Sequence, residues 1–161
     1  MPSAEFEFVV TPSVFDRLLD LEPGSPRDPH VSHYEGVNRL RQAVRRDLEH
    51  LLNTRNPVPD LSGEFVEAGQ SVLAYGVADF TSFNILSVRD QERLRQLVER
   101  SIRSFEPRLT GVSVALLPIG RTERSLRLHV DARLMMDPVP EAVSFDVVMP
   151  QLSSRCEVKE K

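Results

Sequence analysis

The chain has 161 residues, 40 % of them hydrophobic and 27 % charged, which fits one compact domain with a core of ordinary size. Its 20 lysines and arginines stand against 24 aspartates and glutamates, a formal net charge of −4. This balance lacks the basic excess that neutralises phosphates, so nucleic acid is not expected as a partner. No apolar run is long enough to span a membrane and the N-terminus lacks signal-peptide character, which predicts a cytosolic protein without direct membrane insertion.

The first thirty residues predict short elements and a loop. Apolar residues alternate over 5–10, as in a short strand or an extended arm. Thr11 can cap a brief helix whose apolar residues recur over 14–21. Residues 22–30 carry three prolines and one glycine, a composition that forbids regular structure and predicts an exposed loop.

A long amphipathic helix is predicted to follow. Ser32 and Glu35 have the spacing of a capping box, in which each side chain bonds the other residue's amide. Asn53 can adopt the left-handed C-terminal conformation, and Pro57 stops any continuation. Steps of three, four, four and three residues give one apolar stripe, made of Val37, Leu40, Val44, Leu48 and Leu51.

A second main helix is predicted after a less regular segment, 56–87, which includes a helical turn over 71–75 closed by Gly76. Ser87 with Asp90 three residues later resembles an N-terminal cap. Pro107 lacks an amide hydrogen and disfavours helical geometry at the preceding residue, so it ends the helix. The apolar stripe between these points consists of Leu94, Leu97, Val98, Ile102 and Phe105.

Three runs of period two predict strands at 112–117, 126–134 and 143–149. Short connections favour an antiparallel meander with 126–134 in the middle. The polar side of that strand predicts that one sheet face is exposed to solvent, the wet face, and that the helices cover the other face. The fold class is therefore α+β, in a single domain 1–161 whose core spans about 12–149. We expect a flexible C-terminal tail, 150–161, because its apolar content is low.

Residues with catalytic or metal-binding chemistry form no recognised pattern. The four histidines, His30, His33, His50 and His129, show no metal-ligand spacing, and there is no phosphate loop or nucleophile elbow. Cys156 stands alone and is interpreted as a surface thiol. The acidic residues are interpreted as solvated. We therefore expect no catalytic residue, cofactor or metal.

The triplet Glu106, Pro107 and Arg108 is more informative. In an extended stretch Glu106 and Arg108 point to the same side, which presents an acceptor and a donor fork together. Alternatively Arg108 serves the carbonyls at the helix end or pairs internally. The charged run 45–49 is likewise open to two interpretations, a contact surface or a solvated helix face with pairs such as Arg45 with Glu49.

The segments LRQAVRRDLEHLLNTR at 40–55, SVLAYG at 71–76 and FEPRL at 105–109 together resemble the TssE family, small baseplate subunits of type VI secretion systems. That family shares its fold with a baseplate wedge protein of contractile-tailed phages, and members have been labelled lysozyme-like. The likeness runs from about 14 to 149. The chain departs from the family pattern at Ala74, where asparagine is usual, and at Ala43, where serine is usual.

The resemblance implies two main helices packed on a mostly antiparallel sheet, and a structural rather than enzymatic role. It implies partners TssF, TssG and TssK in the baseplate wedge, bound through Glu106, Pro107 and Arg108. It further implies contact with the contractile sheath proteins, whose assembly starts at the baseplate, and a cytoplasmic location on the baseplate at the inner membrane complex. The edge of strand 143–149 is either open, and a candidate for sheath contact by strand addition, or already paired with the N-terminal arm or the C-terminal tail; sheath contact in the family favours the open edge.

Three alternatives to this role remain open. A phage-type baseplate wedge protein is the nearest. A regulatory anti-adaptor on the same fold would bind a response-regulator-like partner, although such proteins usually lack a complete LLNTR and EPR pair. A peptidoglycan hydrolase would need a substrate cleft and an export route, for which the sequence shows no motif.

Overall fold

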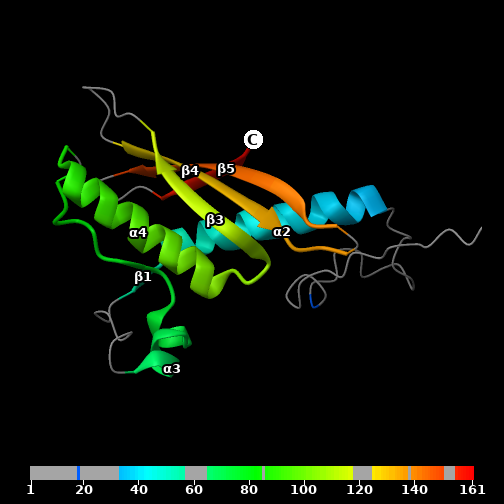
Figure 1. Ribbon diagram of the computed structural model, residues 1–161, viewed down its shortest axis with the longest axis horizontal. Coiled ribbons are helices and arrows are strands. Elements are labelled where there is room, and N and C mark those ends of the chain that lie inside the picture. Colours follow the sequence, from blue (N-terminus) through cyan, green and yellow to red (C-terminus); the bar gives the residue numbers. More distant parts are fainter. Residues whose placement is uncertain are drawn as a thin grey trace, which may run out of the picture.

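The protein folds as two long helices packed on one face of a four-stranded sheet, so the predicted α+β class is confirmed (Figure 1). This computed structural model describes residues 18, 33–56, 65–84, 86–117, 125–137, 139–150 and 155–161. The predicted N-terminal strand, the Ser32 cap and, apart from an exposed Leu18, the first short helix lie outside the described residues.

Helix α2 (His33–Asn53) is amphipathic as the spacing predicts. Four residues of the expected stripe, Leu40, Val44, Leu48 and Leu51, are buried. Val37, at its start, is only half-buried. The chain then enters the two-residue strand β1 (Arg55–Asn56), which pairs in parallel with β2 (Val77–Ala78).

Between these strands lie the short helix α3 (Val66–Gly69) and the 3-10 turn η1 (Val72–Ala74). Ser71 caps η1, since its hydroxyl accepts a hydrogen bond from the Leu73 amide at 3.3 Å. The predicted turn closed by Gly76 is thus confirmed. Gly76 has φ +109°, and a Cβ there would lie 2.5 Å from the carbonyl oxygen of Thr54, so the position requires glycine.

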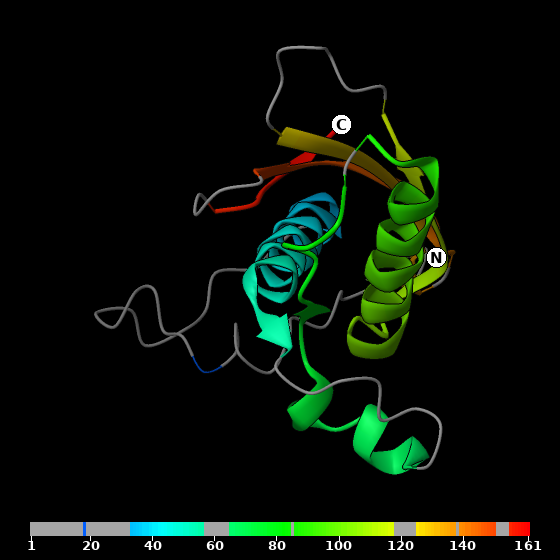
Figure 2. The same cartoon turned by 90° about the vertical axis from the view of Figure 1, so that its left-hand side faces the viewer.

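Helix α4 (Val88–Phe105) begins and ends where the sequence predicts. The Ser87 hydroxyl accepts from the Asp90 amide at 3.4 Å, and the helix stops two residues before Pro107. Its buried side chains are Leu94, Val98, Ser101 and Ile102. They complete the core with α2 and the sheet (Figure 2).

The sheet consists of β3 (Leu109–Leu116), β4 (Ser125–Leu134), β5 (Glu141–Pro150) and β6 (Glu157–Glu160), in that order and antiparallel throughout. The predicted meander with β4 between its neighbours is confirmed. Even-numbered residues of β4 from Leu126 to Leu134 are buried against the helices, while Arg127, Asp131 and Arg133 are exposed. One sheet face is therefore wet, as the alternation predicts.

The prediction of a flexible tail is wrong for its last residues. Strand β6 pairs with β5 from Phe145 to Val148, which covers the edge that we expected to be open. Two tail side chains, Cys156 and Val158, join the core. The two residues are two positions apart, as in a strand. A pattern of only two apolar residues does not distinguish a strand from an exposed segment in the sequence.

The prediction of a surface thiol is also wrong. Cys156 is 4 % exposed. Burial, and to a lesser extent the negative charge of Glu49, raises the pKa of this thiol to about 12. Cys156 is therefore a core residue that stays protonated at neutral pH.

Helix α2 holds β6 with three side chains spaced four and eight residues apart, which lie on one helix face. The Asn53 side-chain amide donates to the Cys156 carbonyl at 3.0 Å and accepts from the Cys156 amide at 2.7 Å. Arg45 donates to the Val158 carbonyl at 3.3 Å, and Arg41 pairs with Glu160 at 3.3 Å. The segment 156–160 is therefore held by these polar contacts with α2 as well as by the burial of Cys156 and Val158.

Candidate partner-binding site

The turn between α4 and β3 contains the triplet singled out in the sequence. Glu106 closes the helix, where its amide donates to the Ile102 carbonyl at 2.9 Å. Leu109 then donates to the Glu106 carbonyl at 3.1 Å and begins β3. Because Pro107 ends the helix inside this tight turn, Glu106 and Arg108 are brought close together.

An ion cluster joins this turn to helix α2. The Arg108 Nε donates to Glu106 Oε1 at 2.6 Å, and its Nη2 bonds the other Glu106 oxygen. The same Nη2 donates to Asp47 Oδ2 at 2.6 Å. Asp47 also accepts from Arg46 Nε at 3.1 Å. We refer to Asp47, Glu106 and Arg108 as the EPR cluster.

The EPR cluster is largely internal. Glu106 is 3 % exposed, and the side chains of Arg108 and Asp47 are 24 % and 34 % exposed. The Glu106 carboxylate, followed by Asp47, raises the pKa of Arg108 against the opposing effect of burial. The guanidinium therefore stays charged and neutralises a carboxylate that would be costly to bury alone.

Tyr75 lies beside the EPR cluster. Its ring meets the ring of Phe105 edge-on, with centroids 5.3 Å apart. Burial first, and then the charges of Asp47 and Glu106, raises the pKa of the Tyr75 hydroxyl. The SVLAYG segment and the FEPRL segment thus meet in space.

The structure changes the interpretation of the triplet. We expected Glu106 and Arg108 to present an acceptor and a donor fork outward, but the two side chains bond each other and Glu106 faces inward. The alternative, internal pairing of Arg108, is what the structure shows. Pro107 is exposed, and the Arg108 side chain is 24 % exposed. Whether these groups bind a partner stays a prediction.

The segment 51–55 makes internal contacts throughout. Leu51 and Leu52 are buried, and Thr54 accepts from the Val77 amide at 2.9 Å. The Arg55 guanidinium stacks over the Phe80 ring, 4.2 Å from its centroid. Asn53 fastens the tail, as described above. In this structure the LLNTR segment supports the fold.

Sequence reasoning missed Asp47 and Tyr75 as members of this site. Asp47 lies in the charged run 45–49, for which a contact surface and a solvated helix face were both left open, and the pair Arg45 with Glu49 is confirmed at 3.4 Å. Asp47 and Arg108 are 61 residues apart, and no local pattern links them. The one hint in the sequence was that Asp47 lies beside Leu48, at the edge of the apolar stripe of α2, where a charged side chain can reach a neighbouring element.

The remaining candidate groups do not form a metal centre in the described part of the chain. His129 bonds Asp146 at 2.6 Å and Asp131 at 3.2 Å on the wet sheet face, whereas His50 is exposed on α2. His30 and the side chain of His33 lie outside the described residues. Of the helices that the structure describes, none has the length and apolar content to cross a membrane.

Comparison with known proteins identifies a family. No curated protein was found to match the chain. The family model described as "Baseplate wedge protein gp25" matches residues 38–139, which is more than half of the chain. The match begins in α2 and ends just before β5, so it includes every residue of the EPR cluster. The chain belongs to the gp25 family of baseplate wedge proteins.

Proposed function

We propose that this protein is the TssE-type subunit of a type VI secretion baseplate. In this role it docks on the wedge core formed with TssF, TssG and TssK and helps to start assembly of the contractile sheath. It acts by binding and carries out no turnover. The single observation that supports this most is the family match, taken with the order of the RDLE, LLNTR and FEPRL segments.

The described contacts refine how docking would work. Glu106 is internal and acts as a positioning residue, because its carboxylate orients the Arg108 fork. The exposed Pro107 and the partly exposed Arg108 side chain are then the groups that touch the wedge core. Among the described contacts, Glu106 and Asp47 take the Nε and Nη2 donors of Arg108, so Nη1 is the donor that would meet a partner carboxylate or main-chain carbonyl.

Co-purification tests this proposal. The tagged chain is co-expressed with TssF and TssG, and we expect the three to elute as one complex. Pro107→Asp should abolish recovery, since it places a carboxylate at the contact. Ala142→Asp is the matched control, because Ala142 is also exposed but lies on the wet face of β5. Pro107→Ala should retain the complex. Absence of TssF and TssG from the wild-type preparation would contradict the proposed function.

The family match also supports the phage-type alternative, a wedge subunit of a contractile tail. The two roles differ in partners and not in chemistry. The genes beside this one distinguish them, since TssF and TssG genes are expected for the secretion role and phage tail genes for the other. The β5 edge is not available for a sheath strand over Phe145–Val148, because β6 pairs with it there.

A further inference from the structure

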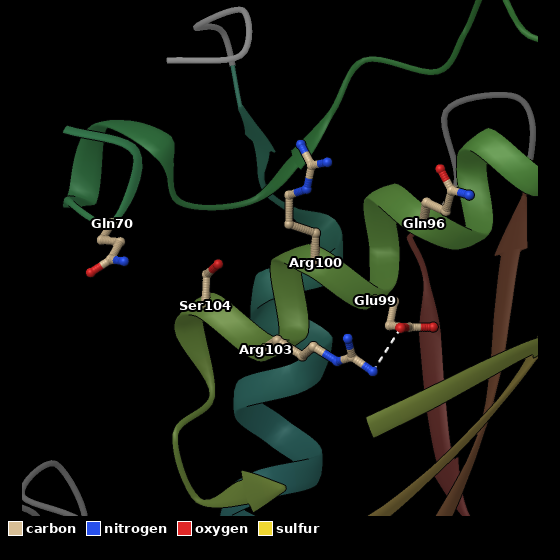
Figure 3. A pocket seen from close by; sticks show the side chains of 6 residues that line it. All are labelled: Gln70, Gln96, Glu99, Arg100, Arg103 and Ser104. Carbon is tan, nitrogen blue, oxygen red and sulfur yellow. Dashed lines mark ion pairs between the residues drawn. The ribbon is translucent and has the colours of Figure 1, made fainter. Parts of the chain in front are cut away.

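Most of the ion pairs that the structure describes join an arginine to a carboxylate. In the hollow of about 470 Å³ between Gln70 and α4, for example, Glu99 pairs with Arg103 at 2.8 Å (Figure 3). Arg103 also donates to the Val112 carbonyl at 2.7 Å. Because a guanidinium does not lose its proton in proteins, such pairs do not respond to acidity. A histidine paired with a carboxylate does respond, since imidazole ordinarily changes its charge between about pH 5 and 8.

His129, in the middle of β4, lies between two carboxylates on the wet face. Its Nδ1 bonds Asp146 Oδ1 on β5 at 2.6 Å, and its Nε2 lies 3.2 Å from Asp131 Oδ1, two positions along its own strand. The antiparallel register places Asp146 opposite His129 and Ser144 opposite Asp131. The Ser144 hydroxyl donates to the same Asp131 oxygen at 2.7 Å, so β5 helps to hold that carboxylate beside the ring. The ring itself is 21 % exposed.

The other charged groups on this side of the sheet lie around the edges of the His129 cluster. On β3 the residue opposite His129 is the uncharged Ala115, and the residue opposite Asp131 is Ser113. The charged side chains that alternate onto the wet face are Arg127 and Arg133 on β4, Glu157 and Lys159 on β6, and Lys161 just after it. Lys159 pairs with Glu157 at 3.8 Å. In the described part of the chain, the side-chain partners of the ring nitrogens are therefore two carboxylates.

The two contacts of His129 together require a doubly protonated ring. An ionised carboxylate only accepts hydrogen bonds, so the bond to Asp146 places a hydrogen on Nδ1. In a neutral imidazole the second nitrogen then carries a lone pair. Nε2 would face the Asp131 oxygen with no hydrogen between two electron-rich atoms, which repel each other. Protonation of Nε2 turns this repulsion into an attraction between a cation and a carboxylate.

We propose that His129 is a proton-dependent switch on the wet face of the sheet. While Nε2 carries a proton, the ring holds Asp131 and Asp146 together across β4 and β5. When this proton leaves, the bond to Asp146 remains, and Asp131 turns toward solvent, to which 59 % of its side chain is already exposed. The centre of the wet face then carries one more negative charge and a carboxylate that the ring no longer holds. The switch does not depend on which partner the protein binds.

Nuclear magnetic resonance of the full chain tests the proposal. Long-range nitrogen–proton spectra report which nitrogen of the His129 ring carries a hydrogen, and three-bond couplings report the rotamer of the Asp131 side chain. At about pH 5 both ring nitrogens should be protonated, and Asp131 should occupy one rotamer. At about pH 8.5 the neutral ring should carry its hydrogen on Nδ1, and the Asp131 couplings should average over several rotamers.

Matched variants assign the effect to this ring and to its bond with Asp146. His129→Gln should remove the pH dependence of the Asp131 couplings. His50→Gln should retain it, because His50 is exposed on α2 and pairs with no carboxylate among the described residues. Asp146→Asn should also remove it, for a different reason. An asparagine amide can donate to Nδ1, so the neutral ring can carry its hydrogen on Nε2, and Asp131 should keep its single rotamer at about pH 8.5.

The wild-type spectra alone give the decisive readings, so the test does not depend on the folding of a variant. A neutral ring with its hydrogen on Nε2 would overturn the inference, because Asp131 would then keep its partner at alkaline pH. Asp131 couplings that stay the same at both pH values would overturn it as well. Among the variants, a pH response of Asp131 that persists in His129→Gln would show that another group controls this carboxylate.

Discussion

Asn53 binds both backbone polar groups of Cys156 through its side-chain amide, and this joins the end of α2 to a residue 103 positions later in the chain. Cys156 directly precedes β6, and the Asn53 side chain forms the two hydrogen bonds that a neighbouring strand would otherwise form with its backbone. A side chain on a helix thereby satisfies a buried backbone amide that would otherwise lack a partner.

Replacing Asn53 with alanine should release the tail. The Cys156 amide then loses its acceptor while it remains buried, a cost of about 1–3 kcal/mol. We expect a lower urea midpoint and faster hydrogen exchange over 156–160. Asn53→Asp, which keeps the acceptor and loses the donor, should be intermediate. Unchanged exchange in the alanine variant would show that β6 is held by β5 alone.

The Cys156 thiol predicts a stability change at alkaline pH. Its pKa is about 12 in the folded chain, above the ordinary value of 9.0, so the folded state holds this proton more tightly. The resulting stabilisation is complete below about pH 9 and is lost as the pH rises toward 12. In urea unfolding from pH 7 to 11, wild type should lose more stability than Cys156→Ala above pH 9. Parallel curves would contradict the buried assignment.

Breaking the EPR cluster should destabilise the fold. Arg108→Ala leaves the Glu106 carboxylate buried without its partner, which costs about 3 kcal/mol. Asp47→Ala should cost about 1 kcal/mol or less, because Asp47 is more exposed. The double variant Glu106→Gln with Arg108→Ala should be more stable than Arg108→Ala alone, since it removes the uncompensated charge. Denaturant titration measures all three, and an Arg108→Ala variant as stable as wild type would show that the cluster is only a surface feature.

Two glycines offer a controlled comparison. Gly76→Ala combines φ +109° with a Cβ that would lie 2.5 Å from the Thr54 carbonyl oxygen, whereas Gly111→Ala has φ +61° and open space around it. We expect about 1–2 kcal/mol for Gly111→Ala from the left-handed backbone alone. Gly76→Ala should cost distinctly more or prevent folding, as measured by thermal unfolding. Equal losses would mean that the loop before β2 moves to accept the methyl group.

The sequence predicted those parts of the fold whose signals are local. The apolar stripes of α2 and α4, the Ser87 cap and the stop at Pro107 each depend on residues a few positions apart. Alternation predicted β3, β4 and β5 in their correct order. Strand β6 was missed because Cys156 and Val158 alone carry its pattern, and because its pairing depends on Asn53, far away in the chain.

The candidate site was predicted by residue type and place, but not by orientation. The triplet 106–108 does lie at the end of α4, yet Arg108 bonds Asp47 on the other helix, and the buried Glu106 pairs with Arg108 from within the fold. Spacing along the chain says which side chains can share a direction. It does not say that Arg108 will pair with a carboxylate 61 residues away.

The two outer strands of the sheet affect how prone the free protein is to aggregate. In β3 the register shifts between Thr110 and Ser113, which disturbs the row of backbone groups, and β6 carries Glu157, Lys159 and Glu160 beside the side chains of α2. Both features discourage a further strand from adding. Free copies of the chain are therefore expected to resist edge-to-edge aggregation, and contacts with a partner are left to side chains, which can be specific where a bare backbone edge cannot.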